Sequence, residues 1–325
     1  MYAPRRRCAW RSSATRCGRP GRTPGPARRS APPEPNDQET SLLEFIEFVL
    51  RGLLLGAIYG MLAYPVSLLF ATTDSVDLSV GAYAVLAAAI TMALGGPVGI
   101  ALGLAGAVAA SLVVGLLSQR IDRRAHHDPL TLVLATFGFA TILESFVLSV
   151  FGKDPMVRQA FDVFWHVGDV TVSPQALINL GAALALLALL YVWLYRSPSG
   201  RDMRASAASA LAATLAGIPV KRLALMTYVA GGLLAGIAGV LILYTTGTIY
   251  SAGLHLTISG FGAALIFGLR SPLRGFAGGL LIGIVQGLSA GYLPTGWAGA
   301  APLLFILLVL ASGRANVAGI AGGRA

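Results

Sequence analysis

Long apolar runs, one after another, are the feature that most limits how this chain can fold. From Ser41 onward they approach the roughly 20 residues that a helix needs to cross hydrocarbon, and short polar stretches separate them. Hydrophobic residues make up 55% of the sequence and charged residues only 12%, whereas about a quarter of the residues of a soluble domain are charged. The pattern predicts an all-α polytopic membrane bundle of eight or nine segments, at residues 42–70, 78–94, 97–118, 130–151, 175–195, 223–245, 255–269, 275–292 and 301–313.

Composition divides the chain into three regions. Residues 1–40 are rich in Arg, Pro, Gly and Ser and predict a disordered basic extension; residues 41–313 form the membrane domain, and residues 314–325 form a short tail. Cys8 and Cys17 both lie in the extension, at a spacing that fits no zinc site. Within the membrane domain, runs 78–94 and 255–269 are short and contain polar residues, so either one is a candidate for a re-entrant or broken helix.

Positive charge alternates between the loops and predicts the orientation. Loops 119–128, 196–222 and 270–274, together with the C-terminal tail, hold twelve Lys and Arg, whereas loops 152–174, 246–254 and 293–300 hold only Lys153 and Arg158. Because cytoplasmic loops are the basic ones, the first set and the C-terminus are expected in the cytoplasm. A fully spanning segment 78–94 would place the basic N-terminal extension outside. Either the extension is absent from the mature protein, or the segment from Asp74 to Leu94 dips into the membrane and returns.

Motifs of soluble enzymes are missing. The sequence contains no Gly-x-x-x-x-Gly-Lys-Ser/Thr loop and no His-Glu-x-x-His pair. We therefore expect no catalytic residues, no metal site and no cofactor bound by this chain. A membrane enzyme or assembly factor is the weakest of the functional alternatives.

Glycine recurs every fourth residue near the end of the chain, and a shorter repeat lies in the first apolar run. Such spacing leaves one helix face bare, so that another backbone can approach closely and van der Waals contact can replace the missing hydrophobic effect. We expect tight helix packing at Gly275, Gly279, Gly283, Gly287 and Gly291, and at Gly52, Gly56 and Gly60.

Polar residues within the apolar runs are few, and their cost at membrane depth makes each one a candidate for the substrate path. Glu144 is interpreted either as a substrate-ammonium or proton site, or as a helix-to-helix hydrogen-bonding carboxyl. His255 and Gln286 have the alternative roles of interfacial and packing hydrogen bonds. The remaining candidates, Asp77, Ser79 and Gly81, belong to the stretch DSVDLSVGAY.

The basic loop 196–222 contains an Ala-rich middle that predicts a short cytoplasmic helix. Residues Ala205 to Leu215 lack helix breakers, Gly217 supplies a stop and Pro219 prevents continuation. A helix of small residues on the membrane surface suits docking into a groove on a cytoplasmic partner; the alternative is a simple amphipathic connector.

At this loop the sequence resembles the permeases of branched-chain amino acid ABC transporters. The resemblance rests on Gly-Arg, Arg-Ala, Leu-x-Gly-Ile and Arg motifs followed by the Ala-Gly-rich stretch LLAGIAGVL, and it extends from RGLLLGAIYGMLAYPVSLLF to LLFILLVLA. It implies an ABC importer permease that is not itself an enzyme, in a bacterial plasma membrane. The residues expected to couple the chain to an ATPase are Gly200, Arg201, Arg204, Ala205, Ala212, Leu215, Gly217 and Ile218.

The same resemblance implies the partners: two cytoplasmic ATPase subunits that carry ATP and magnesium, a second permease subunit, identical or homologous, and an external substrate-binding protein. Branched-chain or related amino acids are the expected cargo. However, Asp77-Leu78-Ser79-Val80-Gly81 is similar to the sibling simple-sugar permeases, and Gln286 stands where the amino acid family has Glu. A simple-sugar permease therefore stays an alternative, as does a proton-coupled secondary transporter that uses Glu144.

Overall fold

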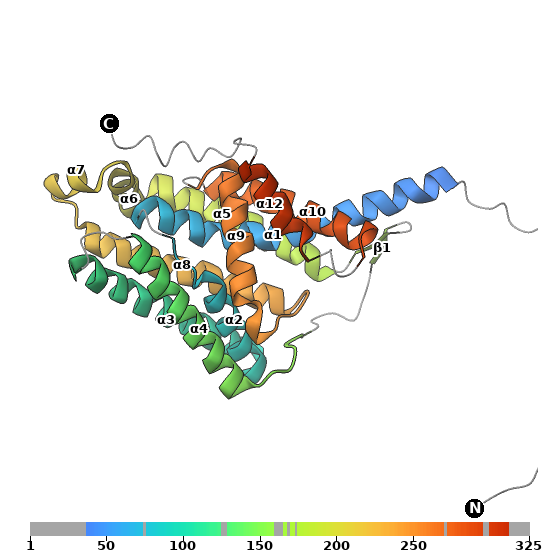
Figure 1. Cartoon of the computed structure of the whole chain (residues 1–325), viewed down its shortest axis with the longest axis horizontal. Helices are drawn as coiled ribbons and strands as arrows, with labels where there is room; N and C mark the ends of the chain where they lie inside the picture. Colours follow the sequence, from blue (N-terminus) through green and yellow to red (C-terminus); the bar gives the residue numbers. More distant parts are fainter. Residues whose placement is uncertain are drawn as a thin grey trace, which may run out of the picture.

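Helices make up almost all of the fold (Figure 1). The computed structural model describes residues 37–73, 76–124, 129–158, 165–167, 170–172, 174–269, 272–294 and 299–311. The helices are α1 (Asp37–Thr73), α2 (Val80–Leu94), α3 (Gly96–Arg124), α4 (Pro129–Phe151), α5 (Pro174–Arg196), α6 (Pro198–Ala208), α7 (Ala210–Leu215), α8 (Val220–Leu243), the 3-10 turn η1 (Tyr250–Ala252), α9 (Gly253–Phe267), α10 (Pro272–Tyr292) and α12 (Ala301–Ala311). One antiparallel hairpin joins β1 (Trp165–Val167) to β2 (Val170–Val172).

Seven of the described helices are long and apolar enough to cross a membrane, and α2 and α12 are shorter apolar helices. The predicted all-α polytopic class is therefore confirmed. Helix α1 begins at Asp37, four residues before the expected start of the membrane domain at residue 41. The extension up to residue 36, with Cys8 and Cys17, and the tail 314–325 lie outside the described residues.

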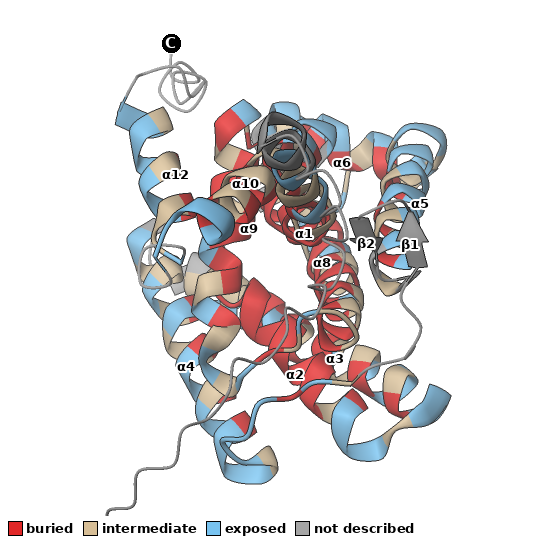
Figure 2. Cartoon of the chain, turned by 90° about the vertical axis from the view of Figure 1, so that its right-hand side faces the viewer, coloured by how far each residue is buried: buried red, intermediate tan, exposed pale blue. Residues whose placement is uncertain are grey.

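Burial separates an inner group of helices from an outer group. In the most apolar window of each helix, 83% of α1 is buried inside the protein but only 22% of α4 and 17% of α5. Figure 2 shows the same contrast, with buried positions on α1, α2, α8 and α9 and exposed ones along α4, α5 and α12. In a protein that crosses a bilayer, the exposed leucines and valines of the outer helices are the surface that lipid covers.

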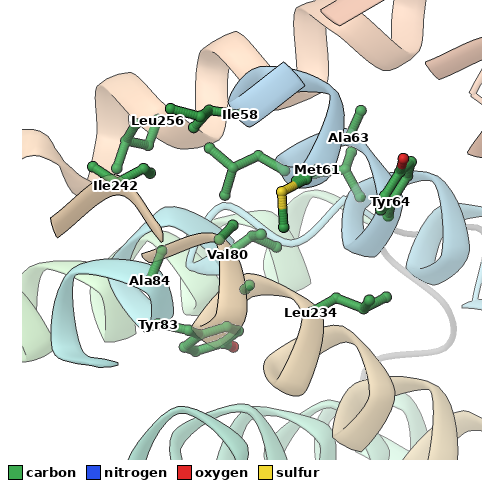
Figure 3. Packing of buried hydrophobic residues seen from close by; sticks show 14 of the residues in the cluster. Ile58, Met61, Ala63, Tyr64, Val80, Tyr83, Ala84, Leu234, Ile242 and Leu256 are labelled. Atoms are coloured by element: carbon green, nitrogen blue, oxygen red, sulfur yellow. The ribbon is translucent and has the colours of Figure 1, made fainter. Parts of the chain in front are cut away.

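Helix α2 is short and lies within the protein. Its 15 residues reach only about 22 Å, less than the roughly 30 Å of a bilayer core. It packs against α1, α3, α8 and α9, and most of its residues are buried. Figure 3 shows Val80, Tyr83 and Ala84 of α2 among side chains from neighbouring helices such as Met61 and Leu234.

Helices α1 and α10 make the most extensive helix pair, and their two glycine repeats face each other. A Cβ added at Gly52 would lie 2.7 Å from the Gly283 carbonyl oxygen, and one at Gly56 would lie 2.7 Å from Leu280 Cα. In the reverse direction, a Cβ at Gly283 would overlap the backbone of Gly56. These obstacles are backbone atoms, which cannot rotate away, so only glycine allows this separation of the helices.

The other members of the repeat lie along the same contact. A Cβ added at Gly279 would overlap the backbone of Gly60, and one at Gly287 would overlap the backbones of Gly52 and Phe48. A Cβ at Gly291 would overlap the Phe48 ring, whereas one at Gly275 would lie 3.0 Å from Ser67 Oγ.

Candidate functional site

The buried turn before α2 contains the first group of predicted path residues. The Asp77 side chain is buried, and its carboxylate accepts hydrogen bonds from the Ser79 backbone N–H (2.8 Å), the Ser79 hydroxyl and the Tyr83 hydroxyl (3.0 Å). Ser79 is also buried, with its Oγ 2.6 Å from the Tyr83 hydroxyl. The carboxylate thus stabilises the start of α2 through its own neighbours in the chain.

Gly81, the third residue of this group, lies where α2 meets α9. Its backbone N–H donates to the Thr257 hydroxyl oxygen (2.8 Å), which also lies 3.1 Å from the Leu78 carbonyl oxygen. A Cβ at Gly81 would overlap the Gly253 carbonyl oxygen. The position therefore serves a close backbone approach between two helices.

A partly polar cavity lies between α1, α9, α10 and the segment after α8, and it brings together two predicted path residues. Its volume is about 390 Å³, and His255 and Gln286 both line it. Tyr59, which the sequence did not single out, donates from its hydroxyl to Gln286 Oε1 (2.6 Å). The hydroxyl and the amide thus form one polar group on the cavity wall.

Aliphatic side chains and neutral hydrogen-bonding groups share the wall of this cavity. None of the described residues that line it is Asp, Glu, Lys or Arg. The apolar part comes from Leu55, Ile58, Val157, Ile242, Ile249 and Leu256, and the polar part from Tyr59, Thr246, Thr248, His255 and Gln286. Such a wall suits a small solute with an aliphatic portion and a few hydrogen-bonding groups.

A short extended segment after α4 closes one side of the cavity. Met156 and Thr248 exchange backbone hydrogen bonds of 2.8 and 2.9 Å, and Arg158 N–H donates to the Leu243 carbonyl (3.0 Å). Pro155 and Val157, on this segment, line the cavity. We call residues 155–158 the strap.

Glu144 lies in a different place from His255 and Gln286. It is half-buried on α4 and lines a cavity of about 70 Å³ beside Tyr250, Gly253 and Leu254. The six predicted path residues therefore fall into three groups: a buried turn, a small cavity beside α4, and the 390 Å³ cavity. Among the residues that the structure describes, no group of three or more His, Cys, Asp or Glu side chains could hold a metal ion.

The basic loop forms two helices, where the sequence predicted one from Ala205 to Leu215. Helix α6 already begins at Pro198, and the chain turns to an extended conformation at Ser209 before α7. The Ser209 side chain accepts from the Ala212 N–H (3.2 Å) and caps α7. Propensity alone missed this break because serine is tolerated in helices, whereas its hydroxyl also offers the backbone a cap.

Gly217 ends α7 as its sequence position suggested. Its φ of +81° lies in the left-handed region that favours glycine. The N–H groups of Gly217 and Ile218 donate to the Thr214 and Ala213 carbonyls (3.1 and 3.0 Å), which is the Schellman pattern. Pro219 follows and starts the turn into α8.

The pair α6–α7 is anchored at one end and exposed at the other (Figure 1). Gly200 and Met203 are buried, and a Cβ at Gly200 would overlap the carbonyl oxygens of Trp193 and Leu194. In contrast, Leu215 is 82% exposed. The neighbouring predicted residues Arg201, Arg204, Ala205, Ala212 and Gly217 are also exposed, and Ile218 is half-buried.

A model of the family described as branched-chain amino acid transport system / permease component matches residues 48–311. The chain belongs to this family. The permease is 28% identical over 288 residues to the high-affinity branched-chain amino acid transport system permease protein LivH of Escherichia coli (strain K12), covering 82% of this chain and 93% of the relative. It is 29% identical over 252 residues to the probable ABC transporter permease protein y4mJ of Sinorhizobium fredii, covering 75% and 74%. No solved structure matches it significantly.

The family match confirms the resemblance read from the sequence and the ABC permease class. The site residues that the sequence did not single out in this permease are Tyr59, Tyr83, Thr257 and Ser209. The hydroxyls of Tyr59 and Thr257 form hydrogen bonds with residues far away in the chain, and the Tyr83 hydroxyl forms one within a buried turn. No local sequence pattern therefore marked these three residues. Tyr83 stands four residues after Ser79, one helical turn away, which was the only available signal.

Proposed function

We propose that this permease forms the translocation path of an ATP-driven importer for branched-chain or related amino acids in a bacterial plasma membrane. The wall of the 390 Å³ cavity supports the cargo class. Aliphatic side chains suit a branched hydrocarbon group, and the Tyr59–Gln286 pair with His255 offers neutral hydrogen-bonding partners. The name of the LivH relative states the same cargo for that protein.

The stretch 77–81 is similar to simple-sugar permeases, but this similarity gives little support to a sugar as cargo. These residues do not line the 390 Å³ cavity, and their polar groups bond to one another or to Thr257. In this proposal they set the start of α2 and do not contact the solute.

The observation that carries the importer mechanism is the exposed pair α6–α7. Leu215, Ala212 and Gly217 offer a small-residue surface with one large apolar side chain, anchored to the bundle through Gly200 and Met203. We infer that a cytoplasmic ATPase subunit binds this surface and that its movement shifts the equilibrium between outward-open and inward-open packings. In this arrangement ATP and magnesium belong to two ATPase partners, and the permease, paired with a second copy or a homologue, receives cargo from an external binding protein.

The two sides of the membrane follow from the same proposal. The α6–α7 end faces the cytoplasm with the basic loops and the C-terminus, and the strap and the β1–β2 hairpin face outward. Figure 1 places α7 and β1 at opposite ends of α1, as this orientation requires.

Reconstituted transport tests the proposal. The permease is placed in liposomes with its ATPase and second permease subunits, binding protein outside, and uptake of labelled leucine and ribose is measured with and without enclosed ATP. ATP-dependent leucine uptake is expected. Uptake of ribose but not of leucine would contradict the proposed amino acid cargo. Leucine uptake driven by a pH step without the ATPase would contradict the ATP-driven mechanism and favour a secondary transporter.

A further inference from the structure

A second cavity lies at the α6 end of the bundle, separate from the proposed solute path. Helices α1, α5, α6 and α10 enclose it, with a volume of about 270 Å³. Leu68, Leu190 and Met203 line it and are almost fully buried. It shares no lining residue with the cavity around His255.

The interior of this cavity suits hydrocarbon. Among the described residues that line it, Thr72 is the one polar residue apart from Arg204 and the two tyrosines at its edge. The Thr72 hydroxyl lies within hydrogen-bonding distance of the Leu68 and Leu69 carbonyls (2.9 and 3.2 Å). The walls therefore have little to offer water. An apolar cavity of only about 150 Å³ is known to stay dry and take up benzene, so this one has room for a longer apolar group.

The edge of the cavity is aromatic and basic. The Arg204 guanidinium carbon lies 4.5 Å from the centroid of the Tyr195 ring, and the Tyr195 and Tyr191 centroids are 4.5 Å apart. Exposed Arg196 is the last residue of α5 and exposed Arg201 lies in the first turns of α6, where Asp202 is the single acidic residue. The local charge is thus positive.

The same edge belongs to a lipid-facing surface. Tyr191 and Tyr195 are about half exposed on α5, next to the exposed apolar residues Leu189 and Val192. Tyrosine and arginine at the end of an apolar helix are typical of the membrane interface, where phosphates lie. A phospholipid placed there would have its head at Arg204 and its chain beside the cavity mouth.

We propose that this cavity binds one acyl chain of an anionic phospholipid, with the lipid phosphate at Arg204. The apolar lining selects a hydrocarbon chain, and the positive edge selects an anionic head over a zwitterionic one. Because Met203 and Ala207 of α6 form part of the wall, the bound chain also supports the anchor of the α6–α7 pair.

Native mass spectrometry tests this proposal on the full chain. The permease is purified from membranes of mixed phosphatidylglycerol and phosphatidylethanolamine, and the retained lipid is identified. We expect one phosphatidylglycerol per permease, with Arg204→Gln lowering retention about fivefold and Ala207→Phe, which fills the cavity, abolishing it. Arg120→Gln, which removes an exposed arginine at the end of α3, is the matched control and should retain lipid as the unchanged protein does.

Several results would overturn the proposal. These are no retained lipid, equal retention of both lipids, retention unaffected by Ala207→Phe, or equal losses in Arg204→Gln and Arg120→Gln. Displacement of the lipid by excess glycerol 3-phosphate would also overturn it, because the site would then bind a free anion and not an acyl chain. An unchanged size-exclusion profile of each variant in detergent ensures that a loss of lipid is not a loss of fold.

Discussion

The α1–α10 contact and the α6–α7 pair both depend on glycine, but for opposite reasons. Between α1 and α10, Gly56 and Gly283 bring two backbones so close that any side chain would overlap a backbone. In α6–α7, Gly217 has no neighbour within 4 Å of an added Cβ, and glycine is favoured there only by its φ of +81°. The first region lies at the packed centre of the bundle, and the second projects toward solvent or a partner.

Glycine therefore supports two separate properties of this protein: the close packing of α1 against α10, and the backbone conformation that ends α7. Substitutions at the α1–α10 contact should affect the folded bundle itself. Substitutions at the exposed positions of α7, such as Ala212, should leave the bundle folded and change only what binds to it.

The largest effect is expected for Gly283→Leu. The new side chain meets the Gly56 backbone, so the helices must separate, at a cost of roughly 3 kcal/mol in the free energy of unfolding. Size-exclusion profiles and thermal unfolding in detergent measure it. Gly181→Leu on α5 is the control, because nothing lies within 4 Å of an added Cβ there, and it should stay monodisperse. Equal behaviour of the two variants would contradict the packing role.

Ala212→Trp should abolish ATP-driven uptake while the protein still inserts and folds. Ala212 is exposed on α7, and an indole there would obstruct a docking groove on the ATPase. Uptake and stimulated ATP hydrolysis are measured in proteoliposomes, with Ala109→Trp on the exposed face of α3 as control. Normal uptake by the Ala212 variant would show that no motor binds α7.

Gly217→Val should reduce coupling less than Ala212→Trp, because it strains the end of α7 without filling the docking surface. A β-branched residue in the left-handed region costs about 1–2 kcal/mol, whereas asparagine tolerates it better. Gly217→Asn should therefore keep more of the ATP-driven uptake than Gly217→Val. If both variants lose uptake equally, the conformation of Gly217 is not what the coupling needs.

Tyr59→Phe should change cargo handling modestly. It removes the hydrogen bond to Gln286, worth about 1 kcal/mol, so a shift of a few fold in the leucine concentration for half-maximal uptake is expected. Tyr292→Phe, at the exposed end of α10, is the control. An unchanged concentration dependence in Tyr59→Phe would show that the 390 Å³ cavity is not part of the solute path.

The smallest effect is expected for Glu144→Gln. Glu144 lies apart from the His255 cavity, and the importer mechanism assigns it no proton transfer. Leucine uptake and its pH profile should be the same in both proteins. Loss of the pH dependence in this variant would instead support the proton-coupled alternative.

The sequence by itself determined the class of this protein. Apolar runs of spanning length, alternating basic loops and glycine spacing are local properties, since helix periodicity and the cost of burying polar groups in hydrocarbon act on each segment separately. The family motifs added the permease assignment, and the glycine repeats marked which helix faces are bare.

Only the tertiary structure decided which of these features meet. It paired the two glycine repeats, joined Tyr59 to Gln286 across 227 positions of the chain, enclosed Asp77 in its own turn, and split the basic loop at Ser209. Contacts between distant helices depend on the rotation and depth of each helix in the bundle. Neither the rotation nor the depth of a helix can be predicted from the periodicity of its own segment.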